Sequence, residues 1–420
     1  CKGRAHTNYI NTMMLYESDN HNRPGSAVSS EIQIFEEKIR GRAVHCNETT
    51  QTIIDNCLTN LSDAAVARLP GFKHIKRNIQ HHRAKNDLPK IPHDKTFDQI
   101  PDKLATTKRN SKFLQFDSGP GNGRLLIFSS VDQLQLLDNC EELLVDGTFK
   151  VTSTIFYQLY TMHVTYRNAV IPVVFALLPN KNQQTYQRLI NKLAELCPPW
   201  NPKSIMMDFE RAAINAFRGS FTTTTNPSTM SSCFFHLQNN IQRKVQELDF
   251  KTNYEQDPVF AHNVSKIAAL AFLQLTDVSQ GFDDLHNSSP PMLHPLLDYF
   301  EDTYIGRQRS QRRSQAMFSV EFWNMHQRTT DLSMRTKNLA EAWHRRLNSI
   351  IQCQHPTLWA FSESLQNEEH FIHCQLIKLN SGQKVEPSKK YLNYSKRLRH
   401  LLTHPHPTLL QQLEGLAHNL

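Results

Sequence analysis

The apolar positions of the early chain recur at helical spacing, over residues 32–39, 53–61 and 73–85. Three prolines within residues 86–102 then interrupt the pattern and indicate a linker. The first of these helices would bury one apolar face, whereas the third is rich in lysine and arginine. The pattern predicts a helical, basic N-terminal region over residues 26–111.

From residue 112 the pattern changes to short apolar runs that are typical of buried strands. Strands are expected over residues 125–128, 143–146, 155–166, 170–178 and 204–208 and in a run that ends at 233–235, with helices over 131–140, 182–196 and 209–217. Three meandering strands followed by helix, strand, helix and strand predict an α/β sheet of the ribonuclease-H type. Residues 112–250 would form the first part of this core.

Helical spacing returns over residues 237–330. Within this stretch, residues 251–330 are expected to form a separate helical domain. A further helix within 331–365 would complete the core, and 366–420 would form a helical tail. In the core helix Leu339, Trp343, Leu347 and Ile350/Ile351 define the face expected to be buried, and Lys337, Glu341, His344 and Asn348 define the opposite, polar face.

Composition narrows the possible partners and compartments. The 420 residues carry 47 Lys+Arg against 39 Asp+Glu, a formal charge of +8, which is compatible with a polyanionic partner. No apolar run is long enough for a membrane span, so no membrane partner is expected. The eight cysteines form no CxxC pair and no dense disulfide framework, which favours a reducing intracellular compartment.

Two basic stretches lack any acidic residue, and each has two interpretations. They can be a solvated helix face and a charged loop, or they can contact nucleic-acid phosphates. Their candidate DNA-binding residues are Lys73, Lys76, Arg77 and Arg83 in the first stretch, and Arg307, Arg309, Arg312 and Arg313 in the second.

Three carboxylates are candidates for chemistry. Asp146 and Asp208 each follow an apolar run, at the ends of strands 143–146 and 204–208, the first and fourth strands of the expected ribonuclease-H-type sheet, although Asp-Gly at 146–147 is also a common turn signal. Glu341 stands on a polar helix face, where glutamates are frequent for no special reason. Two aspartates and a glutamate can bind two divalent cations about 3.5–4 Å apart for phosphoryl transfer. Hard cations such as Mg²⁺ or Mn²⁺ prefer these oxygen ligands.

Five ordered motifs resemble the catalytic domain of Mutator-like (MULE) transposases. They are Leu144–Phe149, Pro172–Lys181, Asp208–Glu210, Cys233–Leu237 and Arg335–His344, within a match that runs from about residue 125 to 365. The resemblance implies a DDE transposase with a ribonuclease-H-like fold, in which Asp146, Asp208 and Glu341 are the catalytic residues and hold two Mg²⁺ or Mn²⁺ ions. It also implies a helical insertion domain before the glutamate, which residues 250–330 fit.

The same resemblance places other residues near the chemistry. The family's Cys-x-x-His motif falls on Cys233 and His236, which are either a buried cysteine and a hydrogen-bonding histidine or half of a zinc site. Arg335, His344 and Arg345 would lie near the scissile phosphate. Lys337 departs from the asparagine that relatives more often carry, which puts one substrate contact in doubt.

The first 25 residues resemble the end of a FLYWCH zinc finger. Cys1 precedes Lys2–Thr7 as in that finger, and His21 would be a second ligand, but Asp19 replaces the other expected histidine. A structural zinc ion needs about four ligands. We therefore expect a truncated remnant that holds no zinc.

The function expected from the sequence is cleavage of DNA at terminal inverted repeats and transfer of the freed strand to target DNA. The partners would be double-stranded DNA and further copies of the chain on it, and the compartment would be the nucleus. One alternative is a domesticated, catalytically inactive DNA-binding or regulatory protein. Another is a structure-selective nuclease that hydrolyses DNA without joining strands.

Overall fold

The computed structural model divides the chain into two compact units, which are described separately. One unit comprises Cys1–Ile91 and His355–Phe361, and the other comprises Pro92–Gln354 and Ser362–Leu420. The structure describes residues 4–7, 14–18, 27–46, 48–84, 89–149, 151–198, 200–222, 227–309, 312–333, 338–351, 355–386 and 389–420.

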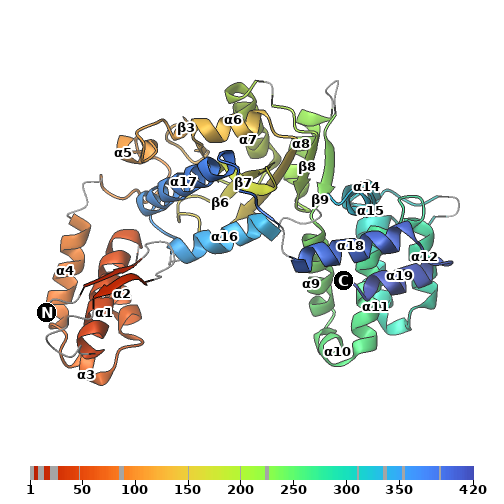
Figure 1. Cartoon of the computed structure of the whole chain (residues 1–420), viewed down its shortest axis with the longest axis horizontal. Coiled ribbons are helices and arrows are strands. Elements are labelled where there is room, and N and C mark those ends of the chain that lie inside the picture. The colour runs from red at the N-terminus through yellow and green to blue at the C-terminus, as the bar shows by residue number, and fades with distance from the viewer. Residues whose placement is uncertain are drawn as a thin grey trace. The chain divides into compact units, whose positions relative to one another are not determined.

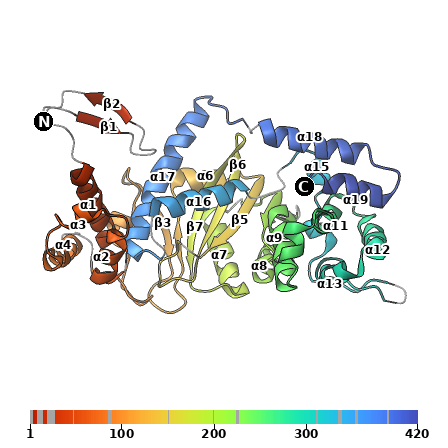
Figure 2. The same ribbon diagram turned by 90° about the horizontal axis from the view of Figure 1, so that it is seen from below.

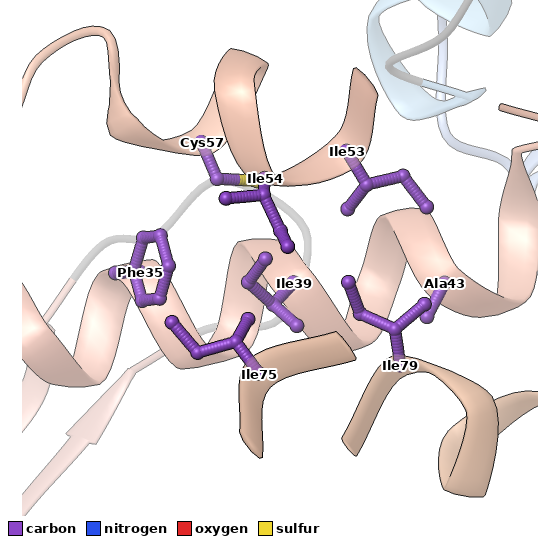
Figure 3. Close-up of a cluster of buried hydrophobic side chains, with 8 residues drawn as sticks. All are labelled: Phe35, Ile39, Ala43, Ile53, Ile54, Cys57, Ile75 and Ile79. Atoms are coloured by element: carbon purple, nitrogen blue, oxygen red, sulfur yellow. The ribbon is translucent and has the colours of Figure 1, made fainter. Parts of the chain in front are cut away.

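The first unit is built around three helices that enclose an apolar core. Its helices are α1 (Ala27–His45), α2 (Thr50–Leu58), α3 (Asp63–Val66) and α4 (Phe72–Ala84). Phe35 and Ile39 from α1 pack against Ile54 from α2 and against Ile75 and Ile79 from α4 (Figure 3). The helical pattern predicted for this region is confirmed, because each helix contributes an apolar stripe to one shared core.

A two-stranded antiparallel sheet precedes these helices. It pairs β1 (Arg4–Thr7) with β2 (Met14–Ser18). Cys1, Asp19 and His21, on which the zinc-finger resemblance depends, lie outside the described residues.

A seven-stranded mixed sheet forms the centre of the second unit, in the order β3-β4-β7-β6-β5-β8-β9. Its strands are β3 (Leu114–Asp117), β4 (Leu126–Phe128), β5 (Glu142–Thr148), β6 (Gln158–Tyr166), β7 (Ala169–Leu178), β8 (Ser204–Met207) and β9 (Thr229–Ser232). The strands from β3 to β5 pair antiparallel, whereas β5, β8 and β9 run parallel to one another. The predicted α/β class is confirmed.

Helices cover both faces of this sheet. Successive residues of a strand point to opposite faces, and the Tyr160 ring lies 5.0 Å from Tyr186 of α7 (Gln183–Leu196). On the other face His163 lies 5.4 Å from Trp343 of α16 (Asn338–Ile351). The helices α7 and α16 therefore lie on opposite sides of the sheet (Figure 1). The remaining helices beside the sheet are α5 (Asp102–Ala105), α6 (Val131–Asp138), α8 (Arg211–Phe221) and α17 (Leu358–Asn380).

A cluster of helices continues the second unit beyond β9. It contains α9 (Phe234–Glu247), α10 (Lys251–Gln256), α11 (Pro258–Ala269), α12 (Val278–Ser288), α13 (His294–Phe300), α14 (Val320–Trp323) and α15 (His326–Thr330). The later helices α18 (Lys389–Thr403) and α19 (Leu409–Ala417) pack onto it, α18 on α15 and α19 on α11 and α12 (Figure 2). The predicted helical character of residues 251–330 is confirmed. The local pattern of residues 366–420 does not show that this tail joins these helices.

The segment read as a linker is held to the sheet domain by one buried arginine. Arg124 donates to Asp117 Oδ1 over 2.9 Å and to the backbone oxygens of Phe97 and Asp98, and its guanidinium stacks 3.6 Å from the Phe97 ring. A charge that is fully buried requires partners of this kind. The proline-rich stretch is therefore part of the domain surface at these residues.

Among the described residues, Cys46, Cys57, Cys140, Cys197, Cys233 and Cys374 are free thiols. No helix in the described part of the chain combines the length and the apolar character that a membrane crossing requires.

Candidate active site

Asp146 lies near the carboxyl end of β5, which is an inner strand of the sheet. Leu143–Val145 are buried in β5, and Asp146 is itself only 6% exposed. Gly147 continues the strand opposite Tyr160, so the alternative of an Asp-Gly turn is wrong. A Cβ atom on Gly147 would lie 2.9 Å from Gln158 Oε1, so the end of the Gln158 side chain would have to shift to admit one.

Asp208 is brought to the same edge by the parallel pairing of β5 with β8. The strand β8 ends at Met207, directly before Asp208. Because parallel neighbours end on the same side of a sheet, the two aspartates converge there. One carboxylate oxygen from each, and a ring nitrogen of His236, lie within 4.8 Å of one another. A cavity of about 60 Å³ lies against both aspartates.

Glu341 reaches this cluster from the first turn of α16, across the face of the sheet. Its Oε1 lies 3.8 Å from His236 Nε2, and the same imidazole places Nδ1 3.2 Å from Asp208 Oδ1. Glu341, His236 and Cys233 also form a group whose ligand atoms lie within 4.8 Å of one another. His236 therefore stands between Asp208 and Glu341 and belongs to both groups of potential metal ligands.

The Cys-x-x-His motif is positioned by the junction between β9 and α9. Cys233 precedes the helix, its backbone N–H donates to Met207 O over 3.1 Å, and its side chain is fully buried against Leu144 and Met206. His236 lies in the first turn of α9, where the exposed N–H groups favour nearby negative charge. Within the described residues, Cys233 thus lies in the apolar packing beneath the site while His236 faces the carboxylates.

His344 belongs to the polar face of α16 that also carries Glu341, and it lies beside the carboxylates. It is buried, and its Nδ1 lies 3.0 Å from Asp146 Oδ2. Its Nε2 lies 3.1 Å from Thr161 Oγ1, which in turn lies 3.0 Å from His163 Nε2. Thr161 and His163 are side chains of the site that the sequence analysis missed, because their strand pattern signals only burial.

His344 is buried because α16 is covered on two sides. Trp343 packs on the sheet against His163 and Phe175, and its Nε1 donates to Glu368 of α17 over 2.6 Å. A helix with two buried sides hides residues that a single apolar stripe would leave exposed. Of Ile350 and Ile351, the pair expected at the end of the buried face, Ile351 is buried and Ile350 is exposed.

Glu210 is a further acidic residue that the sequence analysis quoted only as part of a motif. It lines the same cavity as Asp146 and Asp208, and Tyr186 donates a hydrogen bond to its Oε1 over 2.9 Å. Burial raises the pKa of Glu210, although the hydrogen bond from Tyr186 opposes this change. Burial also raises the pKa of Tyr160 on the same face of the sheet.

The helical cluster is anchored directly behind Asp208. Phe209 lies with its ring centroid 4.9 Å from that of Phe318, 5.3 Å from that of Tyr304 and 5.7 Å from that of Phe322. These edge-to-face contacts bury a large apolar area at the junction between Asp208 and α8. The packing of the helices therefore fixes the backbone that presents Asp208.

The donor atoms of the site suit a divalent cation. Asp146 and Asp208 offer clustered oxygens, the type of ligand that Mg²⁺ and Mn²⁺ prefer, and negative charges held this close are costly without a cation. His236 adds a nitrogen ligand that Mn²⁺ or Zn²⁺ accepts more readily than Mg²⁺ does. The residues present therefore fit a metal-binding site.

The predicted DNA-binding residues fall into groups that differ in their partners. Lys73, Lys76 and Arg77 lie along α4 without an ion pair to any other described residue, whereas Arg83 donates to the backbone oxygens of Ala43 and Glu48. Arg307 pairs with Asp302, and Arg313 pairs with Asp283 and Glu301. The side chains of Arg309, Arg312 and Arg345 are exposed, and Arg335 and Lys337 lie outside the described residues.

Comparison with known proteins gives one family match. Residues 142–240 match the family model described as the MULE transposase domain, a stretch that contains Asp146, Asp208 and His236. No curated protein matches the chain. Among solved structures, the Drosophila P element transposase strand transfer complex is similar at 11% identity, over 94% of this chain and 95% of that chain, with a TM-score of 0.21. A TM-score this low is not a sign of a shared fold.

Proposed function

We propose that this chain is a DDE-type DNA transposase of the MULE family, with a ribonuclease-H-like core and a helical insertion before its third carboxylate. It would cleave DNA at terminal inverted repeats and join the freed 3′ end to target DNA. The family match over residues 142–240 supports the assignment to transposases. The single observation that carries the catalytic proposal is the convergence of Asp146, Asp208 and Glu341 around His236.

Asp146, Asp208 and Glu341 would hold the divalent ions, Mg²⁺ or Mn²⁺. Bound metal supplies Lewis-acid activation of the attacking oxygen and stabilises the leaving oxygen in phosphoryl transfer. In the described structure His236 contacts Asp208 and Glu341. Bound ions would therefore replace these two contacts of the imidazole.

The other residues of the site would fix the geometry of Asp146. Its carboxylate is restrained by His344, whose second ring nitrogen lies against Thr161. Because these groups are buried, water cannot compete for the carboxylate oxygen that His344 contacts. His344 is thus a positioning residue, which holds one face of Asp146 so that the other faces the cavity.

Binding of double-stranded DNA would rely on basic surfaces outside this cluster. Lys73, Lys76 and Arg77 are the strongest candidates, because no described acidic residue neutralises them. Arg309 and Arg312, exposed at residues 307–313, and Arg345, exposed on α16, would add phosphate contacts. We further propose that the protein works as a homo-oligomer on DNA, in the nucleus.

The catalytic proposal is tested by incubating the full chain with supercoiled plasmid and with short duplexes that carry a free 3′-hydroxyl, in Mg²⁺ or Mn²⁺. Asp146→Asn, Asp208→Asn and Glu341→Gln are each expected to lower nicking and strand joining on the order of a hundredfold or more. Glu195→Gln, on the exposed side of α7, is the matched control and should retain full activity. Unchanged activity in any of the three variants would reject the role given to that residue.

The same products separate the alternatives. Joined strands support a transposase, and hydrolysed strands without joining support a nuclease. Tight duplex binding without metal-dependent cutting supports a regulatory protein that has lost catalysis.

The DNA-binding proposal predicts a difference between the two basic segments. Changing Lys73, Lys76 and Arg77 together to glutamine should weaken duplex binding and reduce the salt dependence of log K by about 0.9 per lost phosphate contact. Changing Arg307 and Arg313 to glutamine should leave the salt dependence nearly unchanged, since both already pair with acidic side chains. Equal effects in the two sets would contradict this assignment.

A further inference from the structure

Two histidines and a glutamate meet on the helical cluster, on α11 and at α19. His262 of α11 places Nε2 2.7 Å from Glu414 Oε1, and His418, which caps α19, places Nε2 3.8 Å from the same oxygen. The two imidazole rings are 4.3 Å apart at an angle of 30°. All three potential ligand atoms lie within 4.8 Å of one another.

We propose that His262, Glu414 and His418 form a binding site for a transition-metal ion of the Zn²⁺ class, with water as the fourth ligand. Two imidazoles and one carboxylate are a ligand set that suits Zn²⁺ and that Mg²⁺ disfavours. This site is therefore chemically distinct from the oxygen-rich cluster at Asp146 and Asp208, and it does not depend on the proposed transposase activity.

The distances fit a tetrahedral ion after small side-chain rotations. Zinc–nitrogen and zinc–oxygen bonds of about 2.0–2.1 Å put tetrahedral ligands about 3.3 Å apart. The two separations from Glu414 Oε1, 2.7 and 3.8 Å, lie on either side of this value. His418 is the most exposed of the three, so solvent can supply the fourth ligand.

The backbone that carries these side chains is fixed by apolar packing. Leu413 and Leu416 are fully buried where α19 packs on α11 and α12, and Figure 1 shows α19 alongside these two helices. Glu414 and His418 stand four residues apart, so they project from the same side of α19. A metal ion bound by them and by His262 would clamp α19 to α11.

One neighbouring charge opposes a bound cation. The Lys266 ammonium, one turn after His262 on α11, pairs with Glu414 Oε2. Glu414 Oε1, the oxygen that faces both histidines, is hydrogen-bonded to His262 Nε2 over 2.7 Å, and a bound ion would replace this contact. The hydrogen bond does not involve His418, whereas a metal ion would bring both imidazoles to the same oxygen.

The test is a Co²⁺ and Zn²⁺ titration of the chelator-treated full chain in excess Mg²⁺, followed by absorption spectroscopy and calorimetry. We expect one equivalent of Co²⁺ bound with a spectrum of nitrogen and oxygen ligands, without the thiolate charge-transfer band that binding at Cys233 would add. His418→Ala, His262→Ala and Glu414→Gln should each weaken this site by at least about tenfold. His74→Ala, an exposed histidine on α4, is the matched control and should bind as the unaltered chain does.

Lys266→Met is the decisive companion variant. Removing its charge should tighten metal binding if Glu414 is a ligand, and should change nothing if no ion binds there. His418 is exposed, so His418→Ala is expected to fold, which circular dichroism in chelator checks. The proposal is overturned if the unaltered chain binds no nitrogen-ligated Co²⁺, or if the three ligand variants bind it with unchanged affinity.

Discussion

Two histidine–carboxylate pairs stand at the same edge of the sheet and differ in their access to solvent. In the pair of His344 with Asp146, the side chains are 9% and 6% exposed. In the pair of His236 with Asp208, they are 21% and 31% exposed. The first pair continues into the sheet through Thr161, and the second continues outward to Glu341.

The difference in exposure indicates different roles for the two histidines. A buried pair loses several kcal/mol if one partner is removed, because the remaining polar group is left without water. A partly exposed pair contributes little to stability, since solvent replaces either partner readily. We therefore interpret His344 as the group that fixes Asp146, and His236 as the group that a metal or a substrate can displace.

The largest expected effect comes from removing each carboxylate in turn. Asp146→Ala should destabilise the fold by about 2–3 kcal/mol, because His344 is left buried without its acceptor. Asp208→Ala should change stability by less than about 1 kcal/mol, since it also relieves repulsion among the acidic groups. Urea unfolding in metal-free buffer measures both, with Glu195→Ala as the exposed control. Equal losses would remove the distinction between the two pairs.

Stabilisation of the fold by a bound metal ion should be the next largest effect, and it should depend equally on Asp146 and Asp208. At ten times its dissociation constant, Mg²⁺ or Mn²⁺ is expected to stabilise the unaltered chain by about 1.4 kcal/mol. Asp146→Asn and Asp208→Asn should both lose this gain, as measured by the metal dependence of the thermal midpoint. If Asp208→Asn retained the full gain, the open pair would not belong to the metal site.

The smallest effect is the pH dependence of the stability that Glu210 contributes beside Asp208. Burial raises the folded-state pKa of Glu210 above its ordinary value of 4.5. Its contribution to stability is therefore fully present below the unfolded pKa and is lost as pH rises through the folded pKa. Glu210→Gln cannot ionise, so its stability relative to the unaltered chain should increase as pH rises from about 4 towards neutrality.

Urea midpoints across this pH range test the prediction. Glu195→Gln, which replaces an exposed glutamate, should show no such trend. A constant difference between Glu210→Gln and the unaltered chain would mean that water reaches this carboxylate freely.

Much of the sheet and two of the three carboxylates could be predicted from local pattern. Continuous apolar runs such as Leu143–Val145 indicate buried strands, and an acid directly after such a run must lie at a strand end or at the sheet surface. The Cys-x-x-His motif indicates that His236 lies near the site. It does not indicate that the imidazole stands between Asp208 and Glu341.

Several side chains have partners in the fold that the local pattern of their own stretch does not contain. Arg307 and Arg313 lie in a stretch without acids, but Asp302, Glu301 and Asp283 pair with them in the fold. The helical pattern places His344 on the polar face of α16, but it does not reveal that α17 covers a second side of this helix. Arg124, isolated in the sequence, holds the proline-rich segment that resembled a free linker.

Most strands and helices, the two aspartates that follow apolar runs and the family resemblance can be recognised in the sequence, because these depend on short-range periodicity and on motifs. Which histidine holds Asp146, which one stands beside Asp208 and which basic residues are neutralised is visible only in the folded chain. These outcomes depend on burial and on distances between residues that are remote in sequence, and a linear pattern contains neither.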